Sequence, residues 1–405
     1  MQVVATRQPS LATGFSLLIT ITLSTMAIVL LAPVVPQLMV EFKDVPNADY
    51  LVPVVLTMPA LCIALLSPIA GALSDYVGRR RLLIASLALY GLVGLAPIFL
   101  TDLTAILVSR AFVGIAEALI MVTSTTLIGD YFTGRTRDKW LAAQTAFASV
   151  SALLFFNIGG ILGQSGWRTP FWVYASALAM LAGVLAFTWE PGKDAAPADG
   201  PGHHLHNTSW GDFPWARMSG IVLVTIFGSV FFYTVQIQAS SGLNAHGITS
   251  PAEAGFLTSI ASLGVPLGTY IYGRLDHRNV ARLLFAEFLI LGVGFLVMSF
   301  AATSTGFLVG CAVNQVGAGL LLPTLLVWAM SQLSFEVRAR GTGIWQSAFA
   351  LGQFLSPIIV TSFARREGGL LPALQWLGYG GLAGAAVALA FLMRSGSIGR
   401  PLEAA

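Results

Sequence analysis

Long apolar stretches separated by short polar segments dominate the chain. A stretch of ~20 apolar residues crosses the hydrocarbon core of a bilayer as an α-helix. The chain contains twelve such stretches, at 14–36, 52–74, 83–100, 104–128, 140–164, 170–189, 219–240, 254–273, 283–301, 305–330, 342–363 and 374–393. This pattern predicts an all-α integral membrane protein with twelve transmembrane helices.

The composition points to the same class. Of the 405 residues, 56% are hydrophobic and only 10% are charged, and the mean hydropathy is +0.80. Soluble proteins carry nearer ~25% charged residues, so a soluble multidomain enzyme and a disordered chain are excluded. The pI of about 9.0 reflects a net charge of only +3 without a basic stripe. We therefore expect a lipid bilayer, and no nucleic acid, as the partner of this surface.

The Lys and Arg residues between the stretches predict the orientation. If both termini lie on one side, the segments of that side hold sixteen basic residues and those of the other side hold four. Basic residues are enriched in cytoplasmic loops. We expect a multi-pass protein of the plasma (inner) membrane with both termini in the cytoplasm.

A polar segment divides the stretches six against six. Residues 191–217 are rich in Pro, Gly and His and contain no apolar run, which is typical of a flexible linker. Residues 144–147 (Gln-Thr-Ala-Phe) are echoed by residues 346–349 (Gln-Ser-Ala-Phe). We predict a six-helix bundle at 1–190, a cytoplasmic linker at 191–217 and a second six-helix bundle at 218–405, as two pseudo-repeats.

One motif lies between the second and third stretches. Residues 71–81 read Gly-Ala-Leu-Ser-Asp-Tyr-Val-Gly-Arg-Arg-Arg. This segment resembles the cytoplasmic loop signature of the major facilitator superfamily, apart from Tyr76, where a basic residue is common. The resemblance implies the major facilitator fold and a transporter, not an enzyme, that moves a small molecule by alternating access. It also implies a monomer driven by a proton gradient, without a cofactor.

The same resemblance implies that this loop is a conformational latch. Its members are Gly71, Asp75, Gly78, Arg79 and Arg80. Gly71 would let a neighbouring helix approach closely. Asp75 would meet Arg79 and the N-terminus of a facing helix, whose dipole favours an anion. The alternative is that the arginines only determine the orientation in the membrane.

The fourth stretch carries two charged residues, Arg110 and Glu117. Its motif is similar to that of spinster-type lipid transporters and some organic-anion symporters. Seven residues place the two side chains on nearly one helical face, ~10 Å apart. A carboxylate near the bilayer midplane is costly unless it is paired, protonated or in contact with water. We expect Glu117, with Arg110, to carry the coupling proton; the alternative is a fixed polar clamp.

Glu287 is the only other charged residue within a stretch. It lies about one turn inside the ninth stretch, near Arg282. We expect a surface carboxylate that reaches the membrane interface or pairs with that arginine.

Polar and aromatic side chains within the stretches are candidates for substrate contacts. They are Asn157, Tyr233, Gln236, Gln238, Asn314, Gln315, Trp345 and Gln346. The alternative for each is a hydrogen bond that joins two helices. Most lie in the second half, so we expect this half to bind substrate while the first half handles the proton.

The substrate class remains open between three alternatives. The aromatic residues favour proton-driven export of a small lipophilic, drug-like compound by an antiporter. The second reading is a proton symporter for a monocarboxylate, held by Arg110, and the third is a spinster-like exporter of lysolipids. We expect no metal site, because His203, His204 and His206 of the linker have no Cys or carboxylate partners arranged around them.

Overall fold

The chain folds into long helices only, in the part that the structure describes. The computed structural model describes residues 8–191, 213–275 and 279–395. Within these ranges, twelve helical segments are long and apolar enough to cross a membrane. They coincide with the twelve predicted stretches, so the predicted fold class is confirmed.

The first six spans are built from residues 11–187. Their elements are α1 (Leu11–Thr20), α2 (Thr22–Val29), the 3₁₀ helix η1 (Ala32–Val34), α3 (Val35–Glu41), α4 (Ala48–Val77), α5 (Arg79–Leu95), η2 (Ala96–Ile98), α6 (Leu103–Tyr131), α7 (Gly134–Gly163), η3 (Thr169–Ala175) and α8 (Ser176–Phe187). Pro33 and Pro36 lie where the first span breaks into η1 and α3, because proline lacks the N–H of a regular helical hydrogen bond.

The last six spans are built from residues 215–395. Their elements are α9 (Trp215–Ala245), α10 (Pro251–Ser262), α11 (Gly264–Tyr272), α12 (Val280–Ser299), α13 (Ser304–Ser331), α14 (Phe335–Glu367) and α15 (Leu370–Ser395). The polar residues before the spans fix several helix starts. The Asp102 side chain accepts the N–H of Ala105 at the start of α6, and Ser250 does the same for α10.

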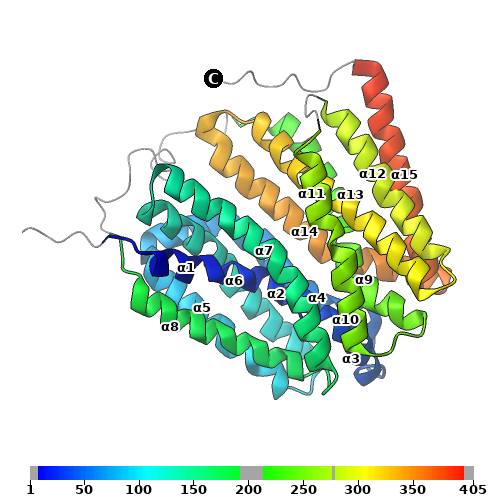
Figure 1. The fold of residues 1–405 in the computed structure, drawn as a ribbon, viewed down its shortest axis with the longest axis horizontal. Helices are drawn as coiled ribbons and strands as arrows, with labels where there is room; N and C mark the ends of the chain where they lie inside the picture. Colours follow the sequence, from blue (N-terminus) through cyan, green and yellow to red (C-terminus); the bar gives the residue numbers. More distant parts are fainter. Residues whose placement is uncertain (1–7, 192–212, 276–278, 396–405) are drawn as a thin grey trace, which may run out of the picture.

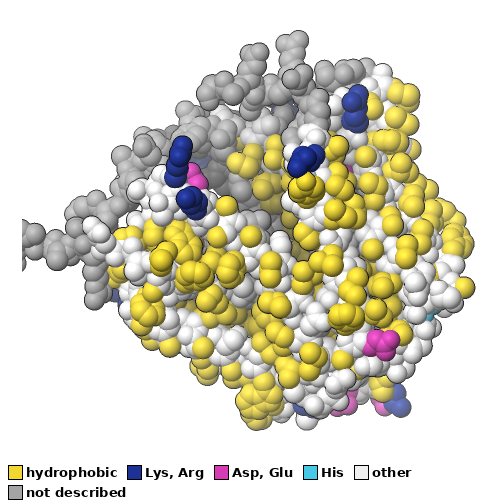
Figure 2. Space-filling view, viewed as in Figure 1, with side chains coloured by type: hydrophobic (Ala, Val, Ile, Leu, Met, Phe, Trp, Pro, Cys, Tyr) yellow, Lys and Arg dark blue, Asp and Glu magenta, His cyan; other side chains and the backbone are white. Residues whose placement is uncertain are grey.

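Each half has its own hydrophobic core. One core cluster joins buried residues between Leu17 and Val184, together with Ile237 of α9. The second cluster joins buried residues between Phe213 and Ala388. Apolar side chains also cover the middle of the surface seen in Figure 2, with charged side chains towards its two ends. This band is the surface expected of a protein in a bilayer.

The two halves are joined at one end of the helices. Twelve alternating spans place residues 191 and 213 at the same end, which we call the linker end. At the opposite end, where α3 and α10 lie in Figure 1, a Cβ atom on Gly255 would be 2.3 Å from the Phe156 carbonyl oxygen. Helices α7 and α10 therefore touch through their backbones at this opposite end.

Candidate functional site

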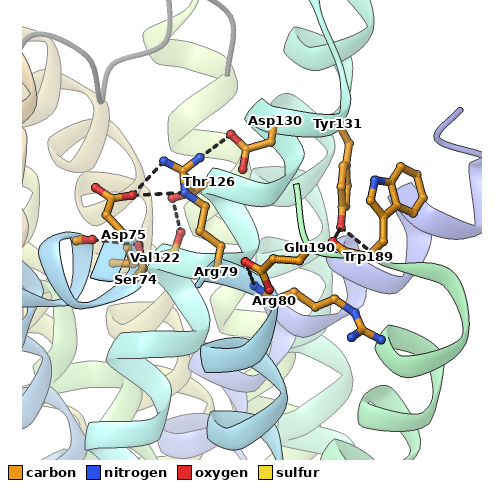
Figure 3. A network of polar contacts seen from close by, with 11 residues as sticks. Ser74, Asp75, Arg79, Arg80, Val122, Thr126, Asp130, Tyr131, Trp189 and Glu190 are labelled. Atoms are coloured by element: carbon orange, nitrogen blue, oxygen red, sulfur yellow. Dashed lines mark hydrogen bonds and ion pairs between the residues drawn. The ribbon is translucent and has the colours of Figure 1, made fainter. Parts of the chain in front are cut away.

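A charged cluster surrounds the turn between α4 and α5. Gly78 has φ +102°, a conformation that favours glycine, and it ends α4 directly before Arg79. Figure 3 shows the Arg79 guanidinium between two carboxylates. Its Nη2 donates to Asp75 Oδ1 at 2.9 Å, and its Nη1 donates to Asp130 at the end of α6. These charges join α4, α5 and α6 of one half.

Residues that follow the sixth span contribute further contacts to the same cluster. Glu190 accepts the backbone N–H groups of Arg80 (3.4 Å) and Arg81 (3.2 Å), so its charge lies at the N-terminus of α5, where the helix dipole favours it. Arg80 Nε donates to Thr188 Oγ1 at 3.2 Å. A Cβ atom at position 78 would approach a Glu190 carboxylate oxygen to 2.9 Å. The positive φ therefore favours glycine there, and a larger residue would also displace the Glu190 carboxylate.

The structure corrects one expectation for this loop and adds one residue to it. Gly71 does not allow a close helix approach here, since a Cβ atom at that position would meet nothing within 4 Å. Asp130, whose side chain is 8% exposed, was not among the predicted latch residues. Its place at the linker end of α6, level with Arg79, was the available signal. The latch role itself stays a prediction.

Arg110 is a fully buried side chain with an exposed fraction of 0%. Its Nε donates to the Val55 carbonyl at 3.1 Å, its Nη2 to the Ala27 carbonyl at 2.8 Å, and its Nη1 to the Tyr174 hydroxyl at 2.6 Å. These partners belong to α4, α2 and η3. The guanidinium is therefore held within the first half by oxygen atoms of three neighbouring elements rather than by Glu117.

Glu117 lies at the midpoint of the 29-residue helix α6. Its side chain is 2% exposed, and its Oε2 atom is buried without a hydrogen-bond partner. The next residue, Ala118, shares a small buried cluster with Ile63 of α4 and Ala350 of α14, so this part of α6 lies close to the second half. Tyr233 of α9 also interacts electrostatically with Glu117. The carboxyl group thus occupies the boundary between the halves, midway along the spans.

The structure brings two predicted substrate residues into one aromatic cluster. Tyr233 and Trp345 both contact the ring of Phe349, each with ring centroids 5.5 Å apart, and Phe232 joins them. The indole Nε1 of Trp345 is buried and has no hydrogen-bond partner. The cluster belongs to α9 and α14, and its Phe349 directly precedes Ala350, which shares a buried cluster with Ala118.

Other predicted substrate residues serve helix contacts within one half. Asn157 donates to the Leu153 carbonyl of its own helix at 2.8 Å. Asn314 donates to the Leu291 carbonyl at 3.1 Å and accepts from Gln315 at 3.4 Å, and both side chains are fully buried. The bond from Asn314 joins α13 to α12, as the alternative reading expects, whereas those of Asn157 and Gln315 stay within one helix.

The three remaining candidates are the glutamines of α9 and α14. Gln236 and Gln346 are half-buried, and Gln238 is buried. Gln238 lines a pocket of about 360 Å³ between the halves at the opposite end, together with residues such as Val35, Pro53 and Val360. Their role in binding stays a prediction, as does that of the whole substrate set.

An ion pair that sequence reasoning missed lines this pocket. Arg365 of α14 donates through Nη2 to Asp49 Oδ1 of α4 at 2.6 Å and to Asn47 Oδ1 at 3.0 Å. Its guanidinium also lies over the Tyr50 ring, 4.4 Å from the centroid. The Tyr50 hydroxyl donates to Ser362 at 3.2 Å. These contacts join the halves across a gap of more than 300 residues in sequence.

The expectation for Glu287 is wrong. The side chain is 1% exposed, and it contacts the hydroxyl of Thr324 on α13 instead of reaching the interface. Arg282 is exposed, and five residues along a helix turn two side chains ~140° apart. The two side chains therefore project in different directions. The histidines His203, His204 and His206 lie outside the described residues.

The chain is similar in sequence to a known protein family and to several characterised proteins. The family model described as "Major Facilitator Superfamily" matches residues 17–357 and 218–401. Tetracycline resistance protein, class C, of Escherichia coli is 25% identical over 378 residues, covering 88% of this chain and 91% of that protein. Multidrug resistance protein 1 of Bacillus subtilis is 30% identical over 171 residues, 42% of this chain and 43% of that protein. The chain thus spans less than half the length of this second relative.

A solved structure supports the same architecture. The crystal structure of a bacterial homologue of the human lysosomal transporter Spinster, inward-facing and unoccupied, superposes with a TM-score of 0.74. The superposition covers 94% of this chain and 94% of that chain at 16% sequence identity. At this identity the likeness establishes the fold alone.

Proposed function

The chain belongs to the Major Facilitator Superfamily, and from this premise we propose that it is a proton-coupled transporter that exports small lipophilic compounds by alternating access. It is a multi-pass membrane protein of a family of transporters, not of enzymes. The single observation that carries the proposal is Glu117, a buried carboxyl group at the midpoint of α6 with an unpartnered oxygen atom. An ionisable group at this depth is by default functional.

Glu117 couples a proton to the motion of the halves because it lies at their boundary. Ala118 beside it belongs to a buried cluster that also contains Ile63 of α4 and Ala350 of α14. When Glu117 is ionised, the packed state of this boundary leaves a charge without a bonded partner, which is unfavourable in a medium of low dielectric constant. Protonation removes that charge and favours the packed state. Arg110, two turns away on the same helix, acts through its electrostatic field.

The aromatic cluster supports a lipophilic substrate. Tyr233, Trp345 and Phe349 provide flat apolar surfaces near Glu117, and the Trp345 indole N–H is a free donor in the same region. A mostly apolar site with a few polar groups is typical of pockets for small organic molecules. The relatives named for multidrug and tetracycline resistance agree with this substrate class.

The symporter alternative depends on Arg110 as the ligand of an anion. Nε and both Nη atoms of Arg110 donate to protein oxygen atoms, and the side chain is fully buried. An anion would have to displace at least one of these bonds. This geometry favours the exporter over the monocarboxylate symporter. The spinster-like reading rests on the similar motif around Arg110 and Glu117 in the fourth span.

The orientation and the latch belong to the same proposal. The excess of basic residues favours a cytoplasmic linker end, and the inner membrane is part of the proposal. Asp49 and Arg365 then hold the outer end closed. In the state open to the outside, the Arg79 cluster would face the second half and act as the cytoplasmic latch. The transporter works as a monomer.

The test uses purified protein in liposomes that contain a pH-sensitive dye. Lipophilic cations, neutral drugs and monocarboxylates are added in turn to the wild type, to Glu117→Gln and to Asp44→Asn, which changes an exposed loop carboxylate. We expect lipophilic compounds to drive proton movement in the wild type and Asp44→Asn but not in Glu117→Gln. Proton movement that persists in Glu117→Gln, or that only monocarboxylates elicit, would reject the proposal.

A further inference from the structure

Glu287 is a buried carboxyl group that the proposed mechanism does not use. It lies on α12 in the second half, with 1% of its side chain exposed. Its Oε1 atom contacts the Thr324 hydroxyl of α13, and its Oε2 atom is buried without a hydrogen-bond partner. A charge in such a position needs a partner of opposite sign or several donors.

The described side chains of the surrounding elements supply no such partner. Helix α13 contributes Thr324, and its only ionisable side chain is Cys311, more than three turns away. Helix α11 contributes Tyr272, which interacts electrostatically with Glu287. The described side chains of α15 include one ionisable group, Tyr379, which is exposed and accepts a hydrogen bond from Gln375. On α12 itself, Arg282 is exposed and points elsewhere.

The hydrogen atoms at Thr324 can be counted. Its Oγ1 atom is within hydrogen-bond distance of two oxygen atoms, Glu287 Oε1 and the Leu320 carbonyl oxygen at 3.0 Å. A threonine hydroxyl has one hydrogen to donate, and a backbone carbonyl only accepts. Both contacts are satisfied in full when the hydroxyl donates to Leu320 and a protonated Glu287 donates to Thr324. An ionised Glu287 would leave two acceptors competing for one hydrogen.

We propose that Glu287 is a second proton-binding site of this protein and holds its proton in the conformation described here. The proton resides on Oε1, directed at Thr324 Oγ1, and Oε2 is the carbonyl oxygen. Release transfers the proton to water and leaves a carboxylate, which becomes favourable when α11 or α13 moves and water reaches the site. Its use in the transport cycle rests on the proposed function, whereas the proton occupancy does not.

Infrared spectroscopy of the protein in lipid tests the occupancy directly. A protonated carboxyl group has a carbonyl stretching band distinct from that of a carboxylate and sensitive to D₂O. We expect the wild type at neutral pH to show such a band that is missing from Glu287→Gln. The amide of Gln keeps a donor for Thr324, so this variant should fold. Thr324→Val should shift the band, and Thr324→Ser should leave it in place.

Transport measurements in liposomes then test whether Glu287 takes part in the transport cycle. We expect Glu287→Gln to move one proton fewer per substrate molecule, while Asp44→Asn retains the ratio of the wild type. An unchanged ratio would remove Glu287 from the cycle. If no band depends on Glu287, the proton site is overturned, whatever Glu117→Gln does. If the band is present and Glu117→Gln still moves protons, the proposed function fails and the Glu287 site stands.

Discussion

Asp49 and Arg365 form an ion pair that joins the two halves at the end opposite the linker. They are 316 residues apart in sequence, and the guanidinium Nη2 lies 2.6 Å from Asp49 Oδ1. Because the pair links α4 to α14, it exists only while this end is closed. It is therefore a marker for one of the two states that alternating access requires.

Removing this pair should favour opening at that end. In Arg365→Gln the carboxylate of Asp49 loses its charged partner, and we expect a larger population with the halves separated there. The distance between spin labels at Lys43 and Glu367, both exposed, would report it. Charge reversal in the double variant Asp49→Arg and Arg365→Asp should restore closure. An unchanged distance distribution in Arg365→Gln would show that packing alone holds the end closed.

Gly255→Ala should also disfavour the closed end, through steric overlap. The added Cβ atom would lie 2.3 Å from the Phe156 carbonyl oxygen, which is far inside normal contact distance. Overpacking of this kind costs about 1–3 kcal/mol. We expect the label distance at the opposite end to increase, as in Arg365→Gln. Gly129→Ala is the matched control, since a Cβ atom there meets nothing within 4 Å.

Arg110→Lys should destabilise the first half. Lysine keeps the charge but lacks the planar fork that binds Val55, Ala27 and Tyr174 together. A hydrogen bond of a charged group is worth about 1.5–3 kcal/mol, so the loss of one or more of them should lower the thermal unfolding temperature. Tyr174→Phe removes one hydrogen bond of the charged guanidinium and should cost about 1.5–3 kcal/mol.

The same experiment separates the two readings of Arg110. If Arg110 were the ligand of an anionic substrate, Arg110→Lys would fold like the wild type and lose only substrate binding. Thermal unfolding measured with and without substrate distinguishes the two cases. Unfolding at the wild-type temperature would contradict the structural role.

The sequence identified Glu117 and Arg110 from their charge alone, because an ionisable residue in an apolar stretch is visible without a structure. The sequence predicted only part of how these two side chains are arranged. Helical periodicity places both on one face, but the partners of Arg110 come from α2, α4 and η3. These are tertiary contacts, and no local pattern encodes them.

Glu287 shows that the position of a residue along a helix does not by itself predict whether its side chain is buried. Its position near the start of the ninth span suggested an exposed residue, yet α13 covers it and provides Thr324. The depth of a residue in the bilayer follows from the number of residues between it and the end of the span. Whether it faces lipid or protein depends on which helices pack against it.

The sequence by itself determined the twelve spans, because hydropathy over ~20 residues decides whether a helix crosses the bilayer. It also determined the position of the loop cluster, since the turn at Gly78 and the adjacent charges are local features. Only the tertiary structure decided which end is closed. The pairing of Asp49 with Arg365 and the contact of Gly255 with Phe156 depend on how two separately packed halves meet. That arrangement changes between conformations, whereas the sequence is common to them all.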